Sequence, residues 1–181
     1  MAETSGTRPL PDAARARLVL AYEACELAEL ARAAVPVGAG ELRPDGTARA
    51  PGATLAHAAR VVAAARRFLA AAAVFERLSG GDWALVGDAL GLSARDARAA
   101  FARAETRFLA ELRSADGHEP PQAGGELSWW RAYLVREPLE AAHDLDDWVL
   151  RHRDGDVDHG PAPVSGALLR AKGLDGLSDR T

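Results

Sequence analysis

Residues 83–102 read WALVGDALGLSARDARAAFA, and this stretch decides how the rest of the chain is interpreted. Two short helices that cross steeply need a small residue where their backbones approach, and Gly87 provides one. The turn between them needs a residue that tolerates a positive φ, which predicts Gly91 in the turn. Ser93 is a good N-cap for the second helix, and Asp96, three residues later, completes a capping-box pair. The spacing therefore predicts two helices joined by a tight turn.

An inner apolar set supports the same two-helix unit. Apolar residues on the facing sides of two crossing helices are expected to be buried together. We also expect Phe101 to pack back on Trp83 or on the long helix predicted before it, and Leu92 to tuck into the core behind the turn. The inner set consists of Val86, Leu90, Leu92, Ala97 and Ala100.

The run from Trp83 to Ser93 has the pattern W-x-x-V-G-x-x-L-G-L-S, and a helix rich in alanine and arginine follows it. This pattern resembles the helix-turn-helix of bacterial transcription regulators, and it is most similar to the region 4 domain of sigma factors. The resemblance covers about residues 80–113. The residues before it do not show the sigma-family sequence that contacts polymerase, so polymerase binding is not implied.

The resemblance implies that the second helix contacts DNA. In the family, this helix enters the major groove and its first turns meet base edges. Arginines at these positions can pair with guanine or with phosphate. Arg103 and Arg107 continue the arginine pattern further along the helix. The DNA-binding residues implied by position are Ser93, Ala94, Arg95, Arg98 and Ala99.

Charge is unevenly spread along the chain. Residues 1–113 carry 15 arginines and 13 acidic residues, a net charge of +2, whereas residues 114–181 carry 7 basic and 13 acidic residues, a net charge of −6. Because acidic groups repel phosphate backbones, contact with DNA should come from the first part of the chain. The segment 82–113 itself carries five arginines and five acidic residues, so its net charge is zero.

The composition favours helices throughout the chain. It has 181 residues, of which 48% are hydrophobic, and alanine dominates this share. Alanine is the best helix former and a poor strand former, and no long alternation of apolar and polar residues argues for a strand. We therefore predict an all-α fold: a helical bundle of about five to six helices that contains the helix-turn-helix, with flexible N- and C-terminal tails.

Several features bear on cellular location. The lone cysteine, Cys25, excludes an intramolecular disulfide framework and is expected to be a small buried side chain. Residues 1–5 lack the charged-then-apolar pattern of a signal sequence, and no run of about 18 apolar residues occurs. These features predict a cytoplasmic protein without a membrane span.

Breaker-rich stretches divide the chain into helices and connectors. We expect a flexible tail over 1–10, a helical domain over 11–152 and a largely disordered tail over 153–181, apart from a short helix near Leu168. Within the domain, Pro11 and Asp12 are predicted to open a first helix that runs to about Val35, followed by a connector over 36–53 and a long helix over about Ala53–Leu78. The helix-turn-helix over about 82–113 comes next, and then a linker over 115–127, a short helix from Ser128 through Leu134 and a helix that begins at Pro138.

Helical spacing also predicts which faces are buried. In the first helix, the glutamates Glu23, Glu26 and Glu29 are interpreted as a solvated stripe. The core-facing residues expected are Leu20, Ala24, Leu27, Ala31 and Ala34 in the first helix, Val62, Leu69, Ala72 and Phe75 in the second, and Leu139, Ala142, Leu145 and Val149 in the last.

Other constellations do not support a catalytic or metal site. Glu140 and His143 have the spacing of a di-iron ligand pair, but those sites need a second such motif, so a surface helix with a His143–Asp147 pair is the better interpretation. Residues 154–158 lack the glycine and glutamate that a calcium loop requires. We predict no enzyme, no cofactor and no metal, and we expect Trp129, Trp130 and Trp148 to be core or interface anchors.

Two hypotheses on function follow. The first is a helix-turn-helix DNA-binding or transcription-associated regulatory protein, acting alone, as a homodimer or with a protein partner. The alternative is a non-enzymatic helical protein–protein interaction module in which the helix-turn-helix is only structural. Exposure of Arg95 and Arg98 favours the first hypothesis, and burial of either side chain against other helices favours the second.

Overall fold

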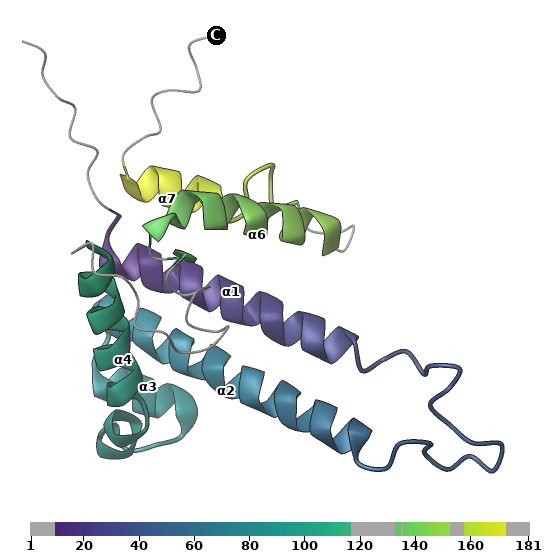
Figure 1. The fold of residues 1–181 in the computed structure, drawn as a ribbon. Coiled ribbons are helices and arrows are strands. Elements are labelled where there is room, and N and C mark those ends of the chain that lie inside the picture. Colours follow the sequence, from purple (N-terminus) through teal and green to yellow (C-terminus); the bar gives the residue numbers. More distant parts are fainter. Residues whose placement is uncertain (1–9, 117–132, 135, 153–157, 173–181) are drawn as a thin grey trace, which may run out of the picture.

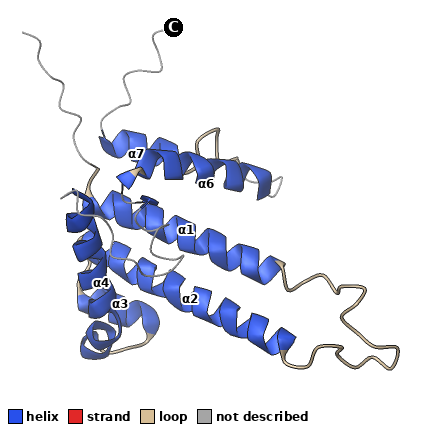
Figure 2. Cartoon of the chain, in the orientation of Figure 1, coloured by secondary structure: helices blue, strands red, loops and turns tan. Residues whose placement is uncertain are grey.

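The computed structural model describes residues 10–116, 133–134, 136–152 and 158–172. These residues form six helices, and the pairing of Leu42 with Ala48 is an isolated bridge rather than part of a sheet. Figure 2 shows helices and loops only, which confirms the predicted all-α class. The helices are α1 (Asp12–Arg32), α2 (Ala53–Leu78), α3 (Trp83–Leu90), α4 (Ala94–Asp116), α6 (Pro138–His152) and α7 (Ser165–Lys172).

Helix α1 lies at the centre of the arrangement. It runs alongside α2 as a long hairpin, and α6 packs on it from another side together with α7 (Figure 1). Helices α3 and α4 gather at the C-terminal end of α2, opposite the loop that joins α1 to α2. The main core joins α1, α2, α4, α6 and α7, and a second, smaller cluster joins α2 to α3 and α4.

The buried face of α1 differs from the predicted one. Leu18 and Val19 are buried, whereas Ala31 and Ala34 are exposed and the helix ends at Arg32 rather than at Val35. Because α1 is covered by α2 on one side and by α6 on another, its buried surface is not a single stripe. Its last turn and the residues after it extend toward the loop and leave the core, which exposes the alanines there.

The predicted solvated stripe on α1 is also wrong at one position. Glu23 is only 2% exposed, and its carboxylate accepts a hydrogen bond of 2.9 Å from Nε of Arg67 on α2. A buried carboxylate costs desolvation energy unless a charged partner and hydrogen bonds compensate it. Spacing along α1 alone could not reveal that an arginine of another helix lies opposite this position.

The large apolar residues of α2 do not all face the core. Val62 is 50% exposed and Leu69 is 40% exposed, although helical spacing predicts both in the buried stripe. The residues buried instead are Ala64, Ala71, Ala73 and Val74. Small side chains let α1 approach α2 closely, and this close packing turns the bulkier residues outward.

The loop between α1 and α2 falls where the predicted connector lies, and it has local order of its own. Arg43 donates its backbone N–H to the carbonyl of Thr47, and Arg49 does the same to Glu41. The side chain and the backbone N–H of Thr47 both donate to Asp45, and these hydrogen bonds lower the pKa of the Asp45 carboxyl. Every residue of this loop is exposed, so the loop is a projection held by its own hydrogen bonds.

The expected short helix near Leu168 is present as α7. Asp146 of α6 is buried and accepts hydrogen bonds from the backbone N–H groups of Val164 and Ser165 and from the Ser165 hydroxyl. This carboxylate therefore caps the N-terminus of α7 from a neighbouring helix. Residues 158–172 of the predicted tail thus belong to the folded unit. The predictions for residues 1–9, 117–132, 153–157 and 173–181 lie outside the described residues.

Candidate nucleic-acid interface

Helix α3 begins at a side-chain cap that the sequence prediction missed. Asp82 precedes the helix in extended conformation, and its carboxylate accepts a hydrogen bond of 2.8 Å from the backbone N–H of Leu85. An aspartate directly before a helical run is a known N-cap signal, so the sequence did contain the information. This cap sets where the two-helix unit starts.

The turn between α3 and α4 has the geometry that its glycines predicted. Gly91 adopts the left-handed conformation with φ of +68°, and Leu92 donates its N–H to the carbonyl of Gly87 at 2.9 Å. A Cβ atom on Gly87 would lie 2.7 Å from the backbone oxygen of Leu92. Glycine is therefore required at position 87 for the close approach of two backbones, as expected.

Helix α4 begins with the predicted cap. The Ser93 hydroxyl accepts a hydrogen bond of 3.1 Å from the N–H of Asp96 and donates one of 2.6 Å to the Asp96 carboxylate. The Ser93 carbonyl accepts the first bond of the helix, from Ala97. The reciprocal pair differs from the usual capping box because the carboxylate binds the serine hydroxyl rather than the serine N–H.

The inner face of this unit is partly as predicted. Val86 and Ala97 are buried together with Ala73 of α2, and Trp83, Leu90 and Phe101 pack against them. Phe101 therefore packs back on the cluster that joins α3 and α4 to Ala73 of the long helix, one of the two expected arrangements.

Two other members of the predicted inner set are exposed. Leu92 is 40% exposed because it lies in the turn rather than behind it, and Ala100 is exposed because it lies on the flank of α4. The buried contact between α3 and α4 therefore involves fewer residues than the sequence predicted.

Arg77, near the end of α2, contacts residues before α3, in α3 and in α4. One of its guanidinium nitrogens donates to the carbonyl of Gly81 at 2.6 Å, and its guanidinium carbon lies 4.6 Å from the centre of the Trp83 ring. Its Nε lies 3.6 Å from the carboxylate of Glu105 on α4. A cation over an aromatic ring and beside a carboxylate ties α2, α3 and α4 together.

The structure brings the predicted DNA-binding residues together on the first turns of α4. Ser93, Ala94, Arg95, Arg98 and Ala99 are all exposed. Neither arginine is buried against α2 or α3, which is the arrangement that the first hypothesis requires. Arg103 was not in the predicted set, yet it is exposed and follows Arg95 and Ala99 at intervals of four residues. That spacing, readable in the sequence, puts it on the same face of the helix.

The charged residues of segment 82–113, whose net charge is zero, differ in how they are paired. Four of the five acidic residues have a partner: the carboxylates of Asp82 and Asp96 accept capping hydrogen bonds, Glu105 lies 3.6 Å from Arg77, and Glu111 lies 3.9 Å from Arg107. In contrast, the side chains of Arg95, Arg98 and Arg103 form no ion pair or hydrogen bond with another described residue. The first half of α4 therefore exposes three arginines without an ion-pair partner among the described residues, with Asp96 between Arg95 and Arg98.

His143 and Trp148 on α6, and Cys25 on α1, were also considered as candidate site or anchor residues. His143 lies 3.6 Å from Asp146, not beside Asp147 as expected, and Nε1 of Trp148 donates to Glu29 on α1 at 2.7 Å. Cys25 is half-buried, and burial, aided by nearby glutamates, raises the pKa of its thiol to about 11.

The described residues also bear on metal and membrane binding. Among them, no group of three or more His, Cys, Asp or Glu side chains is placed to hold a metal ion. No described helix is long and apolar enough to cross a membrane. Trp129 and Trp130 lie outside the described residues.

Comparisons of the chain with protein-family models, with curated proteins and with solved structures find no match.

Proposed function

We propose that the protein is a helix-turn-helix DNA-binding or transcription-associated regulatory protein that inserts the first half of α4 into the major groove. The observation that carries the proposal is the row of exposed arginines beside a small residue, none of them paired with another described side chain. Arg95 and Arg103 lie one turn on either side of Ala99, whose methyl group allows the helix backbone to approach a groove wall. Arg98 adds a third guanidinium within one turn of Arg95.

The N-terminal end of α4 supports the same proposal. The first backbone N–H groups of a helix point outward with a partial positive charge, which favours phosphate. Ala94 and Arg95 are exposed at this end. Asp96 lies nearby, but its carboxylate accepts the hydrogen bond from Ser93 and thereby stabilises the helix start. Phosphate at the helix end would fix the orientation while Arg95 and Arg98 reach base edges.

Fluorescence anisotropy with labelled random and genomic duplexes tests the proposal. We expect binding at low salt that weakens as salt rises, because arginines that neutralise phosphates release counterions. The double variant Arg95→Ala/Arg98→Ala should weaken binding by about tenfold or more. It should also reduce the salt slope by about 0.9 for each phosphate that the protein no longer neutralises.

A charge-matched control separates this result from a general electrostatic effect. Arg32→Ala/Arg49→Ala removes the same two charges at the opposite end of the molecule, where both residues are exposed. We expect this variant to bind DNA nearly as the native protein does. Equal weakening by both double variants, or no binding at low salt, would overturn the proposal.

A second candidate function, a protein–protein interaction module that self-associates, is favoured by a different observation. Six of the eight large hydrophobic residues exposed in the described structure lie on the loop or on α2, away from α3 and α4. Leu55, Val62 and Leu69 follow one another at intervals of seven residues, the spacing of a helix face that pairs with another helix. The alanines between them would allow a second copy of α2 to approach closely.

Light scattering over a range of protein concentrations tests this second function. We expect a dimer that dissociates on dilution and is lost in the double variant Leu55→Ser/Val62→Ser. The variant Ala56→Ser, at an exposed alanine of the same helix that does not lie between Leu55 and Val62 on the proposed face, serves as the control and should keep the dimer. A strict monomer at all concentrations would exclude self-association through this face.

A further inference from the structure

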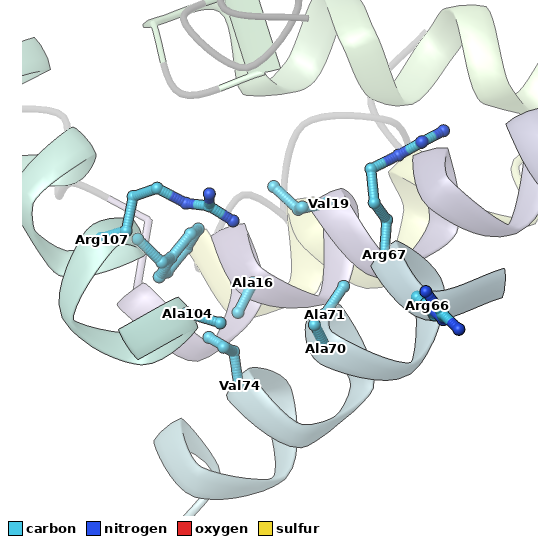
Figure 3. A pocket seen from close by; sticks show the side chains of 10 residues that line it. Ala16, Val19, Arg66, Arg67, Ala70, Ala71, Val74, Ala104 and Arg107 are labelled. Atoms are coloured by element: carbon cyan, nitrogen blue, oxygen red, sulfur yellow. The ribbon is translucent and has the colours of Figure 1, made fainter. Parts of the chain in front are cut away.

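Helices α1, α2 and α4 meet around an open pocket of about 180 Å³. Val19 of α1, Val74 of α2 and Phe108 of α4 line its floor, and each is at most 5% exposed. Much of the remaining wall consists of alanines, among them Ala16 and Ala104 (Figure 3). Protein interiors are normally packed without such space, and alanine side chains that end at Cβ leave it open where three helices converge.

Three arginines surround this apolar floor. Figure 3 shows Arg67 and Arg107 on opposite sides of Val19, and Arg66 lies beside Arg67 on α2. None of the described residues that line the pocket is acidic.

The three guanidinium groups differ in how far they are neutralised. Arg67 is paired with Glu23 at 2.9 Å, and Arg107 lies 3.9 Å from Glu111 with 62% of its side chain exposed. Arg66 is exposed and has no ion pair among the described residues. The rim therefore has positive charge in excess of its local partners.

We propose that this pocket binds a small aromatic carboxylate with the size and charge of benzoate. A cavity of about 150 Å³ lined by apolar side chains holds one benzene ring, so the volume suits a single ring. The Phe108 ring offers an aromatic contact, and a guanidinium group matches a carboxylate through two parallel hydrogen bonds. This site goes beyond the proposed DNA contact and does not depend on it, because none of Arg95, Arg98 and Arg103 lines it.

Titration of the isotope-labelled native protein, followed by amide NMR shifts, tests the ligand class. Three probes are used: benzoate, benzyl alcohol and inorganic phosphate. We expect benzoate to shift the amides of Val19, Val74 and Phe108 to saturation with a Kd about tenfold lower than that of benzyl alcohol. Equal affinity for benzyl alcohol would overturn the role of the arginines. Saturation of the same amides by phosphate at equal affinity would overturn the role of the apolar floor.

Two sets of variants test the contribution of the pocket volume and that of the arginines separately. Ala70 lines the pocket, and Ala70→Leu should fill it and weaken benzoate binding at least tenfold. Ala63→Leu, at an exposed alanine two turns earlier on α2, is the matched control and should leave binding unchanged. Native-like benzoate binding by the Ala70→Leu variant would show that the ligand lies elsewhere.

The surface double variant Arg66→Gln/Arg107→Gln keeps the proposal testable even if Ala70→Leu disturbs folding. It should bind benzyl alcohol as the native protein does but lose the preference for benzoate. Retention of the full tenfold preference would overturn the assignment of the carboxylate to these arginines.

Discussion

The two ends of α2 expose side chains of different chemical character. At its C-terminal end, α3 and α4 bury Ala73, Val86 and Ala97 and expose arginines that pair with no other described side chain. At its N-terminal end, the projecting loop and the first turns of α2 expose apolar side chains, with Leu55 at 75% exposure. The helix has 26 residues and so separates the two ends by roughly 39 Å.

The two proposed functions therefore use different surfaces of the molecule. Exposed guanidinium groups suit a polyanion, whereas exposed aliphatic side chains suit a protein surface that is itself apolar. Because the ends share only the α1–α2 pair, a substitution at one end should leave the other intact. Comparable substitutions at the two ends therefore show whether a change at one end affects stability or binding at the other.

The largest effect is expected at the glycine where α3 and α4 approach. Gly87→Ala would place a Cβ atom 2.7 Å from the Leu92 oxygen, and the backbones must move apart. We expect a loss of about 2–3 kcal/mol in the free energy of unfolding, measured by urea denaturation, together with weaker DNA binding. Gly38→Ala in the loop meets nothing within 4 Å and should change stability by less than about 0.5 kcal/mol. Similar losses in both variants would contradict the requirement for glycine where the two backbones approach.

A smaller difference is expected between apolar residues of the two ends. Val86→Ala removes two methyl groups from a site that is 4% exposed and should cost about 1–2 kcal/mol. Leu55→Ala removes more apolar surface but from solvent, so its effect on the free energy of unfolding of the monomer should stay within about 0.5 kcal/mol. Thermal and urea unfolding at low protein concentration measure both. A large loss from Leu55→Ala would mean that its side chain is covered in solution.

The sequence predicted the C-terminal end of α2 better than the rest because its signals are local. The need for glycine at positions 87 and 91 and the cap formed by Ser93 with Asp96 depend on residues within one or two turns. The order of the helices was also predictable, since prolines and glycines mark their ends. Local chemistry therefore defined the shape of the candidate site.

What the sequence could not predict depends on which helices meet. Val62 and Leu69 look like core residues by spacing, but the buried residues of α2 are mostly alanines instead. Glu23 looks like a surface residue until Arg67 of another helix is placed opposite it. The net charge of zero was also incomplete, because a sum along the chain does not show that Glu105 pairs with Arg77 of another helix.

Each end also has a hydroxyl–carboxylate pair, and the two pairs should differ in their effect on stability. Ser93 and Asp96 start a helix with a buried face, so Ser93→Ala should cost about 1 kcal/mol. Thr47 and Asp45 hold an exposed loop, so Thr47→Ala should change global stability by less than about 0.5 kcal/mol. Urea unfolding compares the two variants. Equal losses would indicate that the loop packs against the helices in solution.

The smallest effect is a local dependence on pH at the loop. Hydrogen bonds from Thr47 lower the pKa of the Asp45 carboxyl when the loop is formed, so ionised Asp45 favours the formed loop. This contribution is fully present above the ordinary aspartate pKa and is lost as the pH falls through the lowered value. NMR titration should show the Thr47 amide changing at a pH below that of an unperturbed aspartate, near 3.9, with no loss of signal dispersion in α3 and α4. Thr47→Ala should return the pKa of Asp45 toward its ordinary value, and an unchanged titration in that variant would contradict the assigned cause. If α3 and α4 titrate together with the loop, the two ends are coupled through α2 rather than independent.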